Sequence, residues 1–390
     1  MLIFAACLAI FVYGMVASML GTISPGLAAK FHLDNVQTGY LALAQGLGLV
    51  LASVSVGPII DRRGKKIGLL LGLGFVTVSL LALAIAPGFG LILAAMVVLG
   101  MGGGIIITGA NALGSDVSES KRASVLNFLN VFVGLGGLAT PFVAGNLLGT
   151  DAVRVAYAAA GLTGLTFLVH LILKIPPPSR LTHAQSSGAV FRRPILYVLA
   201  SATFLYTACE FGIWNWLVKF LLTRGIPEST ALNILSLGFA LGLLIGRVAI
   251  APVLLRVPPL VVTVSASILM AVTTYSVLQL SSTGPIAAIV FLAGMSMAPV
   301  FPTTVAIVGD VFKQGSATAI GFTITCGFSG LVVSSPLIGW LAGPDPAGLR
   351  TGLLLLPAFS LVLVGVNLLL RVLVPKAMAE TGDVVLSVPH

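Results

Sequence analysis

Twelve long apolar segments, separated by short polar connections, dominate the hydrophobic pattern of this 390-residue chain. Each segment is long enough for a helix that crosses a bilayer, which needs roughly 20 apolar residues. The pattern therefore predicts an all-α membrane protein. Charges, prolines and glycines at the segment ends place the helices at 3–29, 35–60, 66–86, 89–114, 122–148, 152–174, 194–222, 229–254, 259–280, 284–311, 315–342 and 350–373.

The helices divide into two sets of six on either side of the longest polar stretch. This stretch contains three consecutive prolines and then several Ser, Gln and Gly residues, which are typical of a flexible linker. We therefore expect an N-terminal bundle at 1–174, a linker at 175–193, a C-terminal bundle at 194–375 and a tail at 376–390.

Composition supports a membrane location and argues against a nucleic-acid partner. Hydrophobic residues make up 58% of the chain and charged residues 8%, whereas soluble domains carry about a quarter charged residues. The net charge of +9 comes mainly from basic residues in the short connections, which is a topology signal rather than a phosphate-binding surface. Fourteen Lys and Arg fall on the side of both termini and five on the other side. We therefore expect both termini in the cytoplasm and the chain in the inner (plasma) membrane.

The two halves of the chain repeat one pattern at a constant offset of 194 residues. Residues 100–117 and 294–311 both begin with Gly-Met and end with Asp-Val. In the same register, Gly48 corresponds to Gly242 and Pro58 to Pro252. Membrane chains built from two parallel repeats are mostly carriers that bind a solute between the halves. The repeat therefore predicts two pseudosymmetric six-helix bundles around a central site.

The connection between the second and third helices carries a motif that we call the latch motif. A glycine permits close helix approach, and a carboxylate at a helix C-terminus needs a positive partner elsewhere. A helix N-terminus in the opposite bundle, or a nearby Arg, could provide that partner, whereas a simple topology anchor would need only the basic residues. The motif consists of Gly57, Asp61, Arg62, Gly64 and Lys65.

This motif, with twelve helices and a two-copy repeat, resembles the signature of the major facilitator superfamily. The resemblance implies a transporter that works by alternating access and uses a contact of this motif with the opposite bundle to hold the cytoplasmic side shut in its outward-facing state. A closer resemblance, to the fucose permease-like sugar–proton symporters, rests on Asn111, Asn127, Asn130, the stretch 206–217 and Gly246-Arg247. That group often has an acid at the position occupied here by Ile107, so its proton site does not transfer to this residue.

One acidic residue lies deep inside an apolar segment. Glu210 is ~22 Å from the cytoplasmic end of its predicted helix, at 1.5 Å per residue. Desolvation favours the neutral form of a buried carboxyl, and intramembrane acids are usually functional. We therefore expect Glu210 to carry a proton. A permanent pair with Arg247, or a role as a substrate ligand only, would also account for it.

Arg247 is the one basic residue that lies away from the ends of a predicted span, about 10 Å nearer the cytoplasm than Glu210. We favour a structural pair with Asp310 at the inner end of the tenth helix, since intramembrane charges usually pair. Binding of a substrate anion is a second possibility.

Aromatic and amide side chains surround these charges and form the candidate substrate site. Aromatic faces can stack on a sugar ring, while amides bind its hydroxyl groups. Some of these amides will instead link helices. The candidates are Gln45, Asn111, Asn127, Asn130, Tyr206, Trp214 and Asn215. The four histidines and three cysteines lack ligand-like spacing, so we expect no metal or cofactor, and we expect the histidines to be solvated or interfacial.

These observations favour a monomeric secondary transporter that takes up a small polar solute, such as a sugar, together with protons. A drug exporter is an alternative, although the glycines around Pro141 fit the exporter signature only in part. A monocarboxylate carrier that uses Arg247 is another. An intramembrane enzyme or a channel is disfavoured, because the spans show neither a catalytic constellation nor a filter-like ring. The sequence shows no ATP-binding element, so an ion gradient is the expected energy source.

Overall fold

The computed structural model describes residues 2–115, 122–175, 188–313 and 315–380, and these fold into helices joined by short connections. Twelve helices or helix pairs are long and apolar enough to cross a membrane. The N-terminal half comprises α1 (Leu2–Phe31), α2 (Asn35–Ser55), α3 (Gly57–Arg63), α4 (Lys65–Ala84), α5 (Phe89–Ser115), α6 (Arg122–Asn146) and α7 (Ala152–Ile172).

The C-terminal half has the same order of spans, with more interruptions. It comprises α8 (Pro194–Thr223), α9 (Glu228–Asn233), the π-helix η2 (Ile234–Ala240), α10 (Leu241–Leu254), α11 (Pro259–Gln279), α12 (Thr283–Met297), α13 (Val300–Val311), α14 (Ser316–Ala342), η3 (Pro346–Gly348), α15 (Leu349–Leu353) and α16 (Leu355–Glu380). A 3₁₀ turn, η1 (Gly188–Arg192), precedes it.

Several boundaries differ from the sequence-based prediction, and three of the differences have a clear cause. The second predicted helix divides at Val56 into α2 and α3, where Pro58 lies in the first turn of α3. The tenth divides before Val300, because Pro299 has no N–H to donate to the preceding turn. Helix α16 continues to Glu380, past the expected start of the tail at residue 376, because residues 376–380 are good helix formers. Most of the predicted linker lies outside the described residues.

The 194-residue repeat is visible in the helix boundaries. Helices α4 and α11 begin 194 residues apart, at Lys65 and Pro259. The same spacing separates the starts of α5 and α12, of α6 and α14, and of α7 and η3. The fold therefore consists of two copies of one six-span unit.

Glycines at equivalent positions support the same crossing in each half. A Cβ on Gly100 of α5 would fall on the carbonyl oxygen of Gln45 in α2. A Cβ on Gly294 of α12 would fall on the carbonyl oxygen of Phe239 in η2. Only glycine permits such close backbone approach. The pairing of these glycines in the repeat therefore reflects one packing rule used twice.

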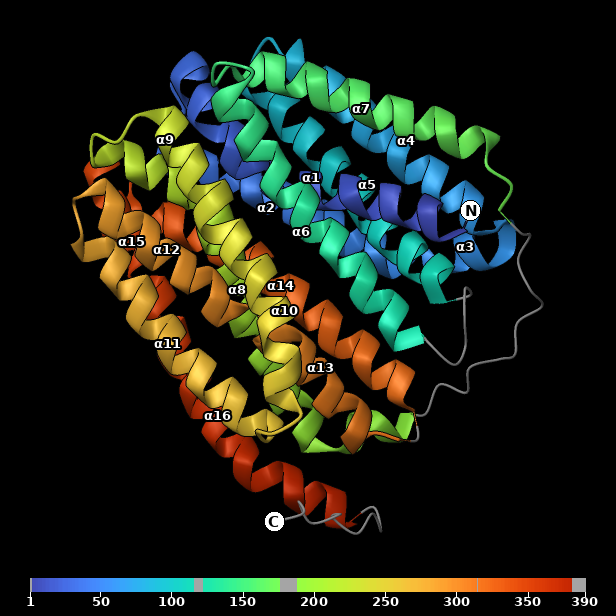
Figure 1. The fold of residues 1–390 in the computed structure, drawn as a ribbon. Coiled ribbons are helices and arrows are strands. Elements are labelled where there is room, and N and C mark those ends of the chain that lie inside the picture. The colour runs from blue at the N-terminus through green and yellow to red at the C-terminus, as the bar shows by residue number, and fades with distance from the viewer. Residues whose placement is uncertain (1, 116–121, 176–187, 314, 381–390) are drawn as a thin grey trace.

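The two halves contact each other at one end of the molecule and diverge towards the other (Figure 1). We call the first the closed end; it holds the connections from α1 to α2, α6 to α7 and α8 to α9. The other, the open end, holds the starts of α1 and α8. Helix α2 packs against α14, and α6 against α9 and η2, which places the equivalent helices of each half at the interface.

Hydrogen bonds between the halves secure the closed end. The Asn35 side-chain amide donates to the carbonyl oxygens of Gly343 (3.0 Å) and Asp345 (2.9 Å). The Lys219 ammonium donates to Thr38 Oγ1 (2.9 Å). The structure is therefore closed on the side that the charge pattern assigns to the cell exterior.

Candidate functional site

Three candidate residues of α8 lie on one face because they are spaced four residues apart. Tyr206, Glu210 and Trp214 follow one another at successive turns of the helix. Glu210 is about 24 Å from Pro194 along the helix axis, which places it deep within the span. The face points towards the N-terminal half, since the Trp214 ring would contact a Cβ on Gly137 of α6. The structure therefore places Glu210 and two of the predicted aromatic residues on a face directed at the other half, and their roles stay a prediction.

Glu210 is half-buried and accepts one long hydrogen bond from a neighbour on its own helix. The Trp214 indole Nε1 lies 3.5 Å from Glu210 Oε1. The indole also packs edge-on against Phe239 of η2, with ring centroids 5.1 Å apart. Among the described residues, no Lys or Arg nitrogen forms an ion pair with Glu210. The carboxyl therefore has neutral neighbours, the Trp214 indole and the Tyr206 hydroxyl.

Arg247 of α10 reaches across the interface to the N-terminal half. Its Nη1 donates to the main-chain oxygen of Asn130 in α6 at 3.4 Å. Its Nε is buried and has no hydrogen-bond partner. Asp310 is exposed, and no ion pair joins it to Arg247 in the part of the chain that the structure describes. In this conformation the expected Arg247–Asp310 pair is absent, and it stays a prediction for other conformations.

Two tyrosines connect Glu210 with Arg247. Tyr206 and Tyr13 of α1 each interact electrostatically with both charges. The Tyr206 hydroxyl is buried and lies near both charges without a well-formed hydrogen bond to either. Tyr206 lies one helical turn nearer the open end than Glu210. Its depth in the membrane is therefore between those of Glu210 and Arg247. We call Tyr13, Tyr206, Glu210, Trp214 and Arg247 the central cluster.

The predicted amide ligands have different environments. Gln45 donates to the carbonyl oxygen of Val16 in α1 at 2.9 Å, and Asn215 donates to Ser335 Oγ in α14 at 2.9 Å. Both side chains are buried and link helices. Asn111 is half-buried and has an interaction partner, and Asn130 is exposed. The Asn127 side chain lies outside the described part of the structure.

The latch motif occupies α3 and its junction with α4 at the open end. Gly64 has a φ of 93°, a conformation that favours glycine and turns the chain into α4. A Cβ on Gly57 would meet no described atom within 4 Å, so none of the described helices packs closely on this glycine in the present conformation. The Asp61 side chain lies outside the described residues. The latch therefore stays a prediction for a conformation closed at this end.

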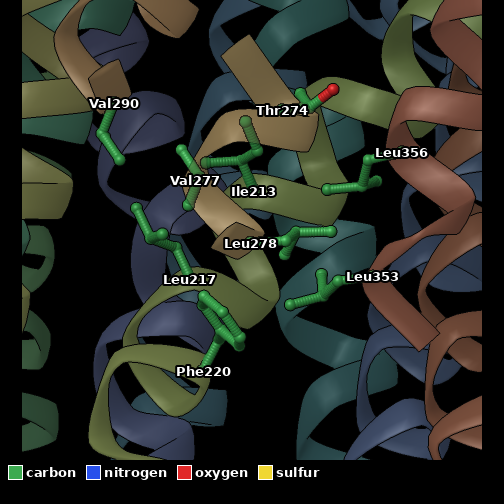
Figure 2. A pocket seen from close by; sticks show the side chains of 9 residues that line it. All are labelled: Ile213, Leu217, Phe220, Thr274, Val277, Leu278, Val290, Leu353 and Leu356. Atoms are coloured by element: carbon green, nitrogen blue, oxygen red, sulfur yellow. The ribbon is translucent and has the colours of Figure 1, made fainter. Parts of the chain in front are cut away.

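A separate apolar pocket lies inside the C-terminal half (Figure 2). Thr274 is the one polar side chain in its lining, and its hydroxyl donates to the Met270 carbonyl oxygen at 2.6 Å. The pocket offers no group that would select a polar solute, and we interpret it as imperfect helix packing. Its lining residues are Ile213, Leu217, Phe220, Thr274, Val277, Leu278, Val290, Leu353 and Leu356.

Two features of the site region were missed or misread in the sequence. Tyr13 belongs to the central cluster, although the only sign of this in the sequence is that it is a tyrosine within the apolar helix α1. His170 is fully buried rather than solvated or interfacial. Its ring nitrogens lie 2.8 Å from the Thr166 oxygen and 3.1 Å from the Ala5 oxygen. Because the Ala5 oxygen belongs to α1, which is distant in sequence, the local hydrophobic pattern around His170 gave no sign of this burial.

Several curated membrane transporters are similar to this chain over part of their length. The 4-hydroxybenzoate transporter PcaK of Pseudomonas aeruginosa is 26% identical over 50% of this chain and 44% of its own. The 3-(3-hydroxy-phenyl)propionate transporter of Escherichia coli is 27% identical over 57% and 58%, respectively. The quinolone resistance protein NorA of Staphylococcus aureus is 25% identical over 38% and 39%. These matches therefore span about half, or less, of each relative.

Solved structures share the fold across nearly the whole chain. The nucleoside transporter NupG superposes with a TM-score of 0.80 at 14% identity, covering 95% of this chain and 99% of its own. The E. coli fucose:proton symporter FucP superposes with a TM-score of 0.64 at 16% identity, covering 94% and 98%. The family model of the Major Facilitator Superfamily matches residues 6–335. With twelve spans in two repeated halves, the chain belongs to the Major Facilitator Superfamily of membrane transporters.

Proposed function

We propose that this chain is a proton-coupled secondary transporter that moves a small polar solute through the central cluster by alternating access. The observation that carries the proposal is Glu210, a half-buried carboxyl deep in a span that no ion pair among the described residues neutralises. A charged carboxylate at this depth is costly, so its proton occupancy will depend strongly on what lies beside it.

The arrangement of the halves supports alternating access. The contacts of Asn35 and Lys219 close one end, while the latch motif at the other end is disengaged at Gly57. We propose that the opposite conformation breaks the first set of contacts and forms the second. Both termini would face the cytoplasm, in accordance with the distribution of Lys and Arg. Labelling of cysteines placed at 183 and 314 from inside the cell would support this topology, and labelling from outside would contradict it.

The amide environments bear on the solute class. Gln45 and Asn215 use their amides to link helices, which leaves fewer groups for sugar hydroxyls than the sequence suggested. The relatives include transporters named for aromatic acids and one for quinolone resistance. A sugar therefore stays a candidate, without specific support from the described amides.

The Glu210→Gln variant tests the proton role. Glutamine keeps the shape and one acceptor oxygen but cannot release a proton. We expect the variant to lose uphill, proton-driven accumulation in proteoliposomes while it retains solute exchange, because exchange needs no net proton movement. Asp151→Asn is the matched control, since asparagine also caps α7 and the site is remote from the cluster. Full proton-driven accumulation by well-folded Glu210→Gln protein would contradict the proposal.

A further inference from the structure

We propose that the central cluster binds a small organic monoanion through Arg247, and that Glu210 takes up a proton as the anion binds. The inference rests on the proton-coupled function proposed above and names its substrate class. It predicts that one anion and one proton cross the membrane together, so that transport carries no net charge.

The incomplete hydrogen bonding of Arg247 is the first observation. A guanidinium has five N–H donors, and here Nη1 makes one long bond to the Asn130 oxygen while Nε is buried without a partner. A buried donor with no partner is costly, so a group that accepts from it binds favourably. A carboxylate matches the guanidinium fork with two parallel hydrogen bonds.

The Tyr206 hydroxyl is the second observation, independent of the first. It is buried and lies beside both Glu210 and Arg247 without a well-formed hydrogen bond to either. A carboxylate on Arg247 would give this hydroxyl a better acceptor. Two donors with incomplete hydrogen bonding, one on α8 and one on α10, therefore lie close together between the halves.

Aromatic rings beside these donors describe the rest of the ligand. Phe301 of α13 packs on Tyr206 with ring centroids 6.1 Å apart, and Phe239 packs on Trp214. Aromatic walls favour an apolar or aromatic body on the anion. Small aromatic monocarboxylates combine both features, whereas a sugar would leave the guanidinium without a countercharge.

The neighbours of Glu210 explain why anion binding would recruit a proton. The charged and titratable groups that interact with this cluster are Tyr13 from α1, Tyr206 from α8 and Arg247 from α10. Without solute, the positive charge of Arg247 acts on the same two tyrosines as Glu210, although no ion pair joins the two charges among the described residues. An anion that binds Arg247 cancels this positive charge and adds a negative charge to the cluster, both of which favour the neutral carboxyl. The proton comes from the solvent on the side to which the site is open.

Binding measurements on the purified full chain test the anion site. The probes are benzoate, 4-hydroxybenzoate and lactate, with benzamide and D-xylose as neutral comparisons. We expect at least one carboxylate, and neither neutral probe, to raise the melting temperature, more at mildly acidic than at mildly alkaline pH. Arg247→Gln should weaken this binding roughly tenfold or more, because hydrogen bonds to charged groups are among the strongest. Arg247→Lys should recover part of it, since lysine keeps the charge but not the fork.

Arg256→Gln is the matched control, because Arg256 lies beyond the end of α10 and outside the cluster. This variant should bind like the unmodified protein. Protection by benzamide or D-xylose that survives in Arg247→Gln, or no protection by any carboxylate, overturns the anion site.

Transport in proteoliposomes separates this inference from the function on which it rests. With a bound carboxylate, uptake above that of protein-free liposomes should follow a pH gradient and ignore an imposed membrane potential. A neutral solute that moves with a proton would respond to both. A potential-sensitive, proton-driven sugar uptake would overturn the anion proposal while leaving the proton role of Glu210 intact. Carboxylate uptake that ignores the pH gradient, in the unmodified protein and in Glu210→Gln alike, would refute the proton role and retain the anion site.

Discussion

Asn146 of α6 and Asn233 of α9 exchange two hydrogen bonds across the closed end. Asn146 Nδ2 donates to Asn233 Oδ1 at 2.7 Å, and Asn233 Nδ2 donates to Asn146 Oδ1 at 3.2 Å. The pair joins the halves at the outer edge of the α6–α9 contact, opposite the bonds that Asn35 makes on the α2–α14 side. Two amide contacts, one on each side of the interface, therefore secure this conformation.

Loss of the Asn146–Asn233 pair should shift the protein towards conformations that are open at this end. We expect Asn146→Ala and Asn233→Ala each to weaken the closed end by about 0.5–1.5 kcal/mol, and the double variant to add little further. Double electron–electron resonance distances between spin labels at this end would measure the populations of the closed and open conformations. Additive effects of the two substitutions would show that the pair does not act as a unit.

The Lys219 ammonium should be a second determinant of closure, since it donates to Thr38 on the opposite half. Lys219→Met keeps the apolar stem but removes the donors, so we expect greater accessibility of the closed end to thiol reagents. Lys30→Met is the control, because Lys30 is an exposed cation at the same end that stacks on Phe31 of its own half. Equal accessibility in the two variants would exclude a gating role for Lys219.

For the latch motif we expect the opposite effect, a shift away from conformations that are closed at the other end. Asp61→Asn should favour the conformation described here and slow transport, because it weakens a charge-assisted contact that closes the other end. Folding should change little. Label distances across the open end that are the same in this variant and in the unmodified protein would show that Asp61 does not latch the halves.

The paired glycine crossings should be intolerant of any side chain. Gly100→Ala and Gly294→Ala each place a methyl group on a backbone oxygen, so we expect losses of about 1–3 kcal/mol or more in the free energy of unfolding. Gly161→Ala and Gly365→Ala are the controls, since a Cβ there meets nothing. Thermal melting in detergent would compare the four. Unchanged stability of Gly100→Ala would mean that α2 and α5 can separate at little cost.

The repeat explains how much of the fold could be predicted from the sequence. Apolar length and a constant offset identify the spans, and the recurrence of Gly48 and Gly100 at the same offset marks positions where helices cross closely. The breaks at Val56 and Pro299 were harder to predict, because helix interruptions depend on neighbouring helices as well as on proline.

The site was predictable where its residues share one helix and less so where they do not. Tyr206, Glu210 and Trp214 are neighbours in the sequence of one predicted helix, and their spacing of four residues gives them a common face in the structure. The contacts of Arg247 and Tyr13 with this face depend on the packing of three helices. Counting residues along a helix gives the depth of a side chain, but it gives neither the length of the side chain nor the tilt of the helix. The local sequence around Arg247 therefore did not indicate that Arg247 lies near the cluster.

The π-helix η2 has a further consequence for the orientation of Arg247. A π-helical stretch inserts about one residue into the turn count, so side chains beyond it face roughly 100° away from their direction in an uninterrupted α-helix. The corresponding part of α2 in the N-terminal half is regular, and the residue equivalent to Arg247 there is Ser53. The chain therefore departs from its internal symmetry here in helix type and in residue type, while the glycine crossing keeps its register, since Gly242 meets the Phe291 carbonyl oxygen as Gly48 meets that of Val97. Deletion of a single residue within Ile234–Ala240 would turn everything beyond it by roughly 100°, so it would move both Gly242 and the guanidinium of Arg247 away from their present partners.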